Sequence, residues 1–260
     1  VGRDSLTAER KWWDDNWEQA NSELSLDRIR REEYFDRLID LINERRPERI
    51  LEAVCGRGQW IKGLGELGFS VDGADFSNVA LQIAKENCGG ANLFQCDLRS
   101  ISVQSGCYDL VLSLGVIEHF EEGPGPVLRE HGRILKSSGV LFAHVPFLNL
   151  NRRLNLVWRG FEYIRQSNRV RKLLGLRKAI FFEYMMTKKE ICELFRGSGL
   201  EIVKGGPIYV WGGFDYDIPF FVKVGIVGKC LDRIRKFVDG HRKLFGPIFS
   251  HHYLVVCKKA

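Results

Sequence analysis

The sequence contains no Cys-x-x-Cys pair, although it has seven cysteines. The cysteines are scattered along the chain, at positions 55, 88, 96, 107, 192, 230 and 257. Without paired spacing they predict neither a zinc site nor a dithiol redox site. An odd, scattered set of thiols is typical of reduced cysteines in a cytosolic protein.

Long apolar runs are also missing. The longest, IPFFVKVGIVGKCL at 218–231, is too short and too interrupted by lysine to span a bilayer. The N-terminal stretch VGRDSLTAERKWWDDNW is charged and lacks the apolar core of a signal peptide. We therefore expect a cytoplasmic protein, with peripheral attachment to a membrane left open.

Neither sign of charge dominates, since 39 Lys and Arg stand against 33 Asp and Glu and give a net charge of +6. This excess is compatible with an anionic substrate or an anionic membrane surface, but it is too small for the basic stripe of a dedicated nucleic-acid binder. No internal repeat or low-complexity tract is present. A chain of 260 residues with 45% hydrophobic residues suits one domain with additions.

Short apolar segments alternate with amphipathic ones through the middle of the chain. Residues 5–45 have helical spacing of apolar residues, ended by Pro47. The segment 108–116 is apolar on both faces and is predicted to be central in a parallel sheet. The predicted strands are 49–54, 70–75, 92–97, 108–116, 139–146, a strand after a helix within 187–203, and the C-terminal 251–259. This alternation predicts an α/β fold wound by right-handed crossovers.

We expect a single domain over 1–260 with distinct parts. The predicted parts are a helical cap at 1–46, a cofactor-binding core at 48–147, and substrate-side insertions at 148–180 and 212–248.

The first predicted strand runs into a turn that contains Gly56 and Gly58. Glycines let a backbone approach a ligand closely, and the N-terminus of the following helix favours negative charge. The dinucleotide fingerprint G-x-G-x-x-G is incomplete because Ile61 stands at its third glycine position, and no P-loop motif is present. A nicotinamide cofactor is therefore disfavoured.

Three acidic residues stand at or near the ends of successive strands. Asp75 can accept hydrogen bonds from both ribose hydroxyls, as in nucleoside-binding folds of this layout. Asp97 is placed to accept from an adenine amino group, with Leu98 donating its backbone N–H to the ring. Glu52 suits a cationic amino-acid moiety. Together they predict a positively charged nucleoside better than a pyrophosphate.

Four segments in order, ILEAVCGRG, VDGADFS, LFQCDLRSI and YDLVLSLGVIEHF, resemble motifs of class I S-adenosylmethionine-dependent methyltransferases of the methyltransferase-11/23 type. The likeness covers roughly residues 48–204 and the final strand. It implies a Rossmann-like, seven-stranded, mostly parallel sheet with an antiparallel last strand, an N-terminal helical cap and lid insertions. It also implies S-adenosylmethionine as cofactor and S-adenosylhomocysteine as product.

The resemblance implies cofactor contacts residue by residue. Those at the methionine part are Glu52, Gly56 and Gly58; at the ribose and adenine, Asp75, Phe76, Asp97 and Leu98; at the sulfonium region, Ser113 and Leu114. Val54 replaces the first glycine of the family motif, and its side chain is expected to crowd the methionine carboxylate or to shift the backbone.

Glu118 and His119 follow the fourth strand, where a methyl acceptor is expected. His119 can act as a general base because the ordinary pKa of histidine lies near operating pH. The alternative is that this pair forms only structural hydrogen bonds, as it does elsewhere in the family. No metal is implied. His144, on the fifth strand, is interpreted as a hydrogen-bonded core histidine.

The acceptor class is a small molecule, a lipid or a glycoconjugate. The segments 151–178 and 219–245 mix basic and apolar residues, which fits a lid over an acidic substrate, an anionic membrane surface or a homodimer interface. The N-terminal KWWDDNW can cap the cofactor site or pack in the core. The alternatives are a cofactor-binding partner subunit with little catalysis and, although nucleic acid is disfavoured, an RNA methyltransferase.

Overall fold

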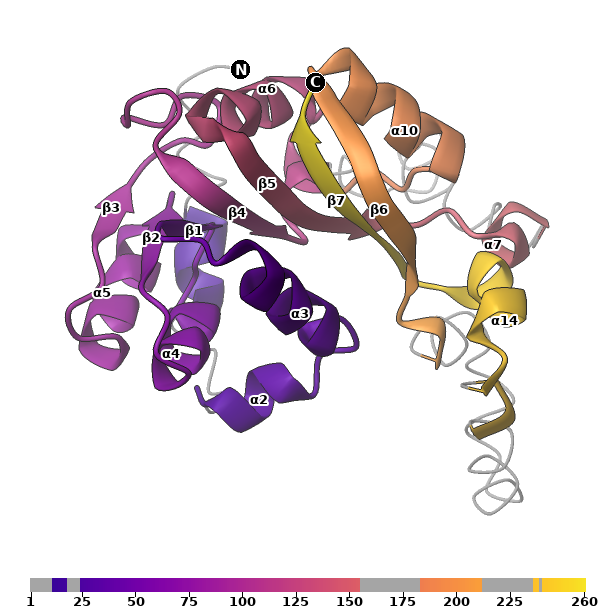
Figure 1. Cartoon of the computed structure of the whole chain (residues 1–260), viewed down its shortest axis with the longest axis horizontal. Coiled ribbons are helices and arrows are strands. Elements are labelled where there is room, and N and C mark those ends of the chain that lie inside the picture. The colour runs from indigo at the N-terminus through magenta and orange to yellow at the C-terminus, as the bar shows by residue number, and fades with distance from the viewer. Residues whose placement is uncertain (1–10, 18–23, 155–182, 212–235, 239) are drawn as a thin grey trace, which may run out of the picture.

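The computed structural model describes residues 11–17, 24–154, 183–211, 236–238 and 240–260 (Figure 1). It contains a seven-stranded sheet in the order β3-β2-β1-β4-β5-β7-β6. The strands are β1 (Ile50–Ala53), β2 (Val71–Asp75), β3 (Leu93–Gln95), β4 (Tyr108–Leu114), β5 (Leu135–Pro146), β6 (Leu200–Ile208) and β7 (His252–Lys259). Strands β1 to β5 pair in parallel, and β7 runs antiparallel to both β5 and β6. The predicted α/β fold with an antiparallel last strand is confirmed.

Helices cover both faces of the sheet. They are α2 (Leu26–Arg30), α3 (Phe35–Arg45), α4 (Gln59–Glu66), α5 (Asn78–Asn87), α6 (Gly125–Ile134), α7 (Leu150–Leu154), α10 (Lys188–Gly197) and α14 (Arg242–Phe249), with the 3-10 helix η1 (Ile117–His119). Residues 11–17 are also helical. Helices α6 and α10 cover one face, and α2 to α5 cover the other (Figure 1). No helix within the described ranges has the length and apolarity needed to cross a membrane.

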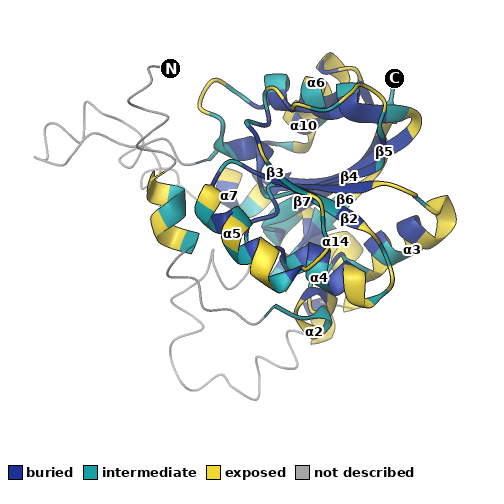
Figure 2. Cartoon of the chain, turned by 90° about the vertical axis from the view of Figure 1, so that its left-hand side faces the viewer, coloured by how far each residue is buried: buried dark blue, intermediate teal, exposed yellow. Residues whose placement is uncertain are grey.

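Alternate residues of the central strands pack into two hydrophobic cores, one on each face of the sheet. Leu51 and Val111 pack on the α6 and α10 side, whereas Ile50, Leu110 and Leu112 pack on the side of α2 to α4. This follows from the two-residue period of a strand, which sends neighbouring side chains to opposite faces. β4 is therefore buried on both sides, as its sequence predicts, and the buried sheet lies between helices whose outer faces are exposed (Figure 2).

The stretch predicted to be helical over 5–45 is divided into separate helices where the structure describes it. The backbone N–H of Arg31 bonds to carbonyls of the last turn of α2, which ends at Arg30, and α3 begins only at Phe35. Between them the side chain of Tyr34 is buried against Trp60. The turn at 31–34 thus separates the two helices at the point where this ring enters the core.

Other predicted boundaries agree with the structure or shift slightly. Ser77 caps α5, as predicted, because its hydroxyl accepts from the N–H of Ala80. The fifth strand begins at Leu135 rather than at 139, because α6 ends at Ile134. The first insertion opens with α7, and 155–178 lies outside the described residues.

Candidate functional site

The carboxyl ends of β1, β2 and β4 lie side by side at one edge of the sheet. The strand register pairs Ala53 with Ala74 on one side and with Ser113 on the other. Glu52, Asp75 and Ser113 therefore come from neighbouring strands, as the sequence predicts for a ligand site at a switch in strand order.

The turn after β1 needs glycine for reasons that lie within the chain. Gly56 has a φ of +52° and Gly58 a φ of +83°, both in the left-handed region that favours glycine. A Cβ on Gly56 would lie 2.6 Å from Cη2 of Trp17, and one on Gly58 would collide with Sγ of Cys88. Val54 also has a positive φ, +64°, and its side chain packs against the core on the α6 side. Val54 thus stands where the family has glycine and still has a backbone conformation that favours glycine.

Asp75 organises the loops around this turn. Its carboxylate accepts from the backbone N–H of Gly56 and of Ser77, each at 2.8 Å. The Ser77 hydroxyl donates to Asp14 of the helix at 11–17. Burial raises the pKa of Asp75 to about 6, although these backbone donors oppose the rise. Asp75 is 3% exposed, and with this pKa it is mostly ionised at neutral pH.

Glu52 is buried beside Asp75. It is 5% exposed, and its pKa is raised well above the usual value, first by burial and further by the negative charge of Asp75. The backbone N–H of Ile61 opposes the rise, but Oε2 has no hydrogen-bond partner among the described residues. Two buried carboxyl groups at the strand edge favour a bound cation, since an uncompensated buried charge is costly.

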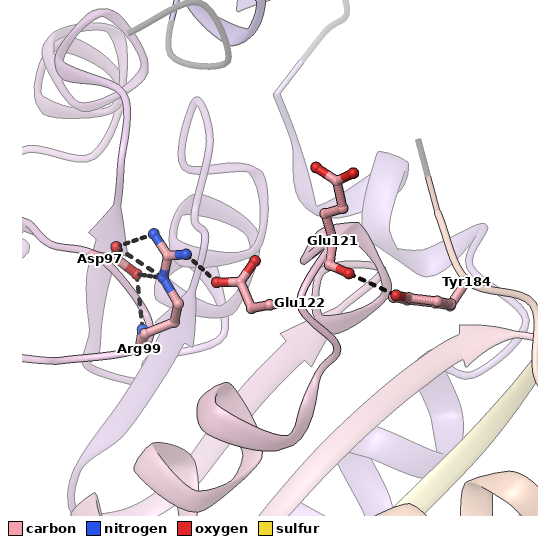
Figure 3. Close-up of polar contacts among 5 residues, drawn as sticks. All are labelled: Asp97, Arg99, Glu121, Glu122 and Tyr184. Carbon is pink, nitrogen blue, oxygen red and sulfur yellow. Dashed lines mark hydrogen bonds and ion pairs between the residues drawn. The ribbon is translucent and has the colours of Figure 1, made fainter. Parts of the chain in front are cut away.

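Asp97 does not stand free at the end of β3. Its two carboxylate oxygens accept from the guanidinium of Arg99 at 2.6–3.0 Å (Figure 3). These bonds lower its pKa even though partial burial opposes the shift. If Asp97 accepts a hydrogen bond from an adenine amino group, as the sequence predicts, it must do so while its carboxylate also accepts from Arg99. The neighbouring Leu98 is buried.

The remaining predicted cofactor residues line the same edge. Ser113 is fully buried on β4, and its hydroxyl has no partner among the described residues. Leu114 and Phe76 are partly exposed, and the backbone carbonyl of Phe76 accepts from the side chain of Gln95 at 2.9 Å. The cofactor roles of these residues stay predictions, but the fold brings the residues together.

The segment that carries Glu118 and His119 is tied down on two sides (Figure 3). On one side, Arg99 forms an ion pair with Glu122. On the other, the hydroxyl of Tyr184 donates to the backbone carbonyl of Glu121 at 2.6 Å. The sequence gives no signal for either tie, because both join segments far apart in the chain.

Glu118 lies inside the protein, and His119 lies at its surface edge. Glu118 is 2% exposed, and its pKa is raised to about 8, first by burial and then by the charge of Glu183. His119 is half-buried, and Trp13 packs edge-on against it with ring centroids 5.6 Å apart. The two candidate catalytic residues thus lie beyond the end of β4, as predicted.

The helix at 11–17 lies across the glycine turn and the acceptor side. Trp17 covers Gly56, Trp13 stacks on Trp17 with centroids 6.4 Å apart, and Asp14 contacts Ser77. Of the two interpretations of KWWDDNW, the structure supports the cap over the site.

A cluster of aromatic rings at the ends of β5, β6 and β7 was missed by the sequence analysis. His144 packs against His252 and Tyr34, with centroids 4.9 and 5.1 Å apart, and Tyr209 adjoins all three. Burial, with a smaller contribution from the charge of His251, lowers the pKa of His144 to about 3. His144 is buried as predicted, but Nδ1 has no partner among the described residues, so its hydrogen bonding is not fully satisfied.

A family model described as a methyltransferase domain matches residues 26–204 of the chain. This match spans the sheet edge, the glycine turn and the segment of Glu118 and His119.

The chain belongs to this methyltransferase family.

Two curated relatives are both named ubiquinone biosynthesis O-methyltransferase. The one from Nitrosomonas europaea is 30% identical over 54% of this chain and 58% of its own, so the match spans less than two thirds of that relative. The one from Bordetella avium is 27% identical over 74% of this chain and 76% of its own. A SAM-dependent methyltransferase from Methanosarcina mazei shares the fold, with a TM-score of 0.54, 16% identity and coverage of 81% of this chain and 92% of that chain.

Membership of the family confirms a class I methyltransferase domain whose cofactor is S-adenosylmethionine. The residues fit this cofactor. The partnerless oxygen of Glu52 suits its ammonium group, and Asp75 suits its ribose hydroxyls. The cofactor would supply the methyl group on its sulfonium, and Glu52 and Asp75 are the residues that would hold and orient it.

Proposed function

We propose that the chain transfers the methyl group of S-adenosylmethionine to a hydroxyl oxygen of a small molecule. The observation that carries this proposal is the buried pair Glu52 and Asp75 beneath the glycine turn, in a chain of the methyltransferase family. Methyl transfer is an in-line displacement, so alignment of donor and acceptor supplies most of the rate enhancement.

An aromatic hydroxyl is the acceptor that we favour. The curated relatives are named O-methyltransferases of ubiquinone biosynthesis, and ubiquinone is a quinone with methoxy groups. Aromatic hydroxyls lose a proton more readily than aliphatic ones. His119, which lies beyond β4, would be the residue that accepts this proton.

Two measurements separate this proposal from that of a partner subunit with little catalysis. Calorimetric titration with S-adenosylmethionine tests cofactor binding, and mass spectrometry of phenolic acceptors tests methyl gain. His119→Ala should lower the rate by about a hundredfold or more, whereas His241→Ala, an exposed histidine before α14, should not. Cofactor binding without methyl gain on any phenol would favour the partner subunit.

A membrane surface is the second partner that we propose. Helices α7 and α14 pack against each other (Figure 1), and each exposes a leucine, Leu154 at 70% and Leu244 at 64%, beside basic residues such as Lys243. Much of the predicted 151–178 and 219–245 lies outside the described residues. Co-sedimentation with vesicles of anionic lipid, compared with neutral lipid, tests this proposal, and Leu154→Asp with Leu244→Asp should reduce binding.

A further inference from the structure

Three side chains near the acceptor position bring metal-ligating atoms together. One ligand atom from each of Glu118, His119 and Glu183 lies within 4.8 Å of the other two. Glu118 and His119 belong to η1, whereas Glu183 lies far from them in the sequence, directly before Tyr184. Two carboxylates and an imidazole are ligands that divalent transition ions and zinc accept.

A second observation, independent of this spacing, concerns Glu118. The residue is 2% exposed, and its Oε2 atom has no hydrogen-bond partner among the described residues. Buried carboxylate oxygens are ordinarily hydrogen-bonded or bound to a metal. The nearby carboxylate of Glu183 adds a second negative charge, so a cation is the compensation that this arrangement favours.

The backbone holds the two segments in this relation. The N–H of Tyr184 donates to the carbonyl of Glu118 at 3.0 Å, and the Tyr184 hydroxyl donates to the carbonyl of Glu121 at 2.6 Å (Figure 3). Arg99 holds Glu122 from the other side. A metal site needs its ligands fixed by such supporting contacts, since a loose set binds weakly.

We propose that Glu118, His119 and Glu183 bind one divalent cation, at the side of the pocket where the methyl acceptor enters. Three protein ligands leave coordination positions open for water or for an oxygen of the acceptor. We choose Mn²⁺ as the test ion, because it accepts both carboxylate and imidazole ligands.

This proposal deepens the proposed function and rests on it for its chemical role. The cation would bind the acceptor hydroxyl oxygen and lower its pKa, so that the proton leaves to water. An oxygen lone pair then forms the bond to the methyl carbon as the bond from carbon to sulfur breaks, and its electron pair stays on sulfur to give S-adenosylhomocysteine. In this form of the proposed function the ion would take over from His119 the task of preparing the hydroxyl, and the loss of rate expected in His119→Ala would follow from the loss of a metal ligand.

Cation binding is measured on the full chain after treatment with a chelator, without cofactor or acceptor. Electron paramagnetic resonance follows the loss of the free Mn²⁺ signal as protein is added. We expect one Mn²⁺ per chain, with affinity lowered at least about tenfold in Glu118→Gln and in Glu183→Gln. Glu121→Gln is the matched control, because this neighbouring carboxylate is exposed and is directed away from the contacts drawn in Figure 3.

Absence of Mn²⁺ binding at millimolar concentration would overturn the proposal, as would equal losses in Glu121→Gln and Glu118→Gln. If Glu118→Gln does not fold by circular dichroism, Glu183→Gln and His119→Gln decide the result. Cofactor titration without metal is read separately. Mn²⁺ binding without cofactor binding would sink the proposed function and leave the cation site, and the opposite result would sink only the cation site.

Discussion

Val54 is a β-branched residue at a φ of +64°, a region that costs such residues roughly 1–2 kcal/mol. Glycine carries no such penalty, but it would lose the packing of the Val54 side chain against the core. We expect Val54→Gly to be more stable than Val54→Ala by about 0.5–1 kcal/mol, the reverse of the usual order. Urea unfolding of the two variants measures this difference, and a more stable alanine variant would show that the strain is absent.

Asp75 should make cofactor binding depend on pH. Its pKa in the folded chain is raised to about 6, and ribose hydroxyls donate better to the ionised carboxylate. Affinity for S-adenosylmethionine should therefore be full above pH 7 and fall by about tenfold for each unit below 6. Calorimetry from pH 7.5 to 5 tests this expectation. Asp75→Asn should bind weakly with no such slope, and a wild-type slope preserved in that variant would assign the titration to another group.

Among the elements, the helix at 11–17 contributes most to the site without belonging to the sheet. Trp17 covers Gly56 and should hold the glycine turn beneath the cofactor. We expect Trp17→Ala to weaken cofactor binding by about tenfold, the cost of losing an aromatic contact. Trp12→Ala is the control, because Trp12 lies on the same helix and is 47% exposed. If calorimetry finds the same loss of cofactor affinity in both variants, Trp17 has no direct part in cofactor binding.

Helix α6 contains a buried histidine that should make stability depend on pH. His131 is fully buried, and neither ring nitrogen has a partner among the described residues. Burial lowers its pKa from 6.5 to about 4. Between these values the unfolded chain binds a proton that the folded chain does not. The contribution of neutral His131 to the free energy of unfolding is therefore fully present above pH 6.5. It decreases as the pH falls, by roughly 3 kcal/mol at pH 4.

The contribution of His131 is isolated by comparing wild type with His131→Leu in urea unfolding at several pH values. The difference in unfolding free energy should change between pH 6.5 and 4 in favour of the variant. A constant difference over that range would contradict the shifted pKa.

For the whole molecule, the buried acids of the site oppose folding until a cation compensates them. Glu52→Gln removes a buried acid, so the variant without ligand should melt at a higher temperature than wild type. Wild type should gain about 5–10 °C in Tm from S-adenosylmethionine at a hundred times its Kd. The variant should gain less. Differential scanning calorimetry measures both shifts, and equal gains would remove Glu52 from the cofactor site.

Local patterns determined most of the sheet. The apolar runs from β1 to β5 and the capping residue Ser77 depend on side chains within a few positions, so their elements follow from sequence alone. The glycine turn and the acids at the strand ends also follow, because parallel strands place their carboxyl ends at one edge. The break between α2 and α3 was not predicted, because the burial of Tyr34 against Trp60 depends on the packing of elements distant in the sequence.

Sequence by itself determined the parallel core and its family, since these depend on short-range periodicity and on motifs with fixed spacing. The same motifs predict the residues that would surround the cofactor. Only the tertiary structure brought Trp17 onto Gly56, Arg99 onto Glu122, and Glu183 beside Glu118. Each of these contacts joins residues separated by more than twenty positions. Their partners are selected by the packing of the tertiary fold, which no local pattern records.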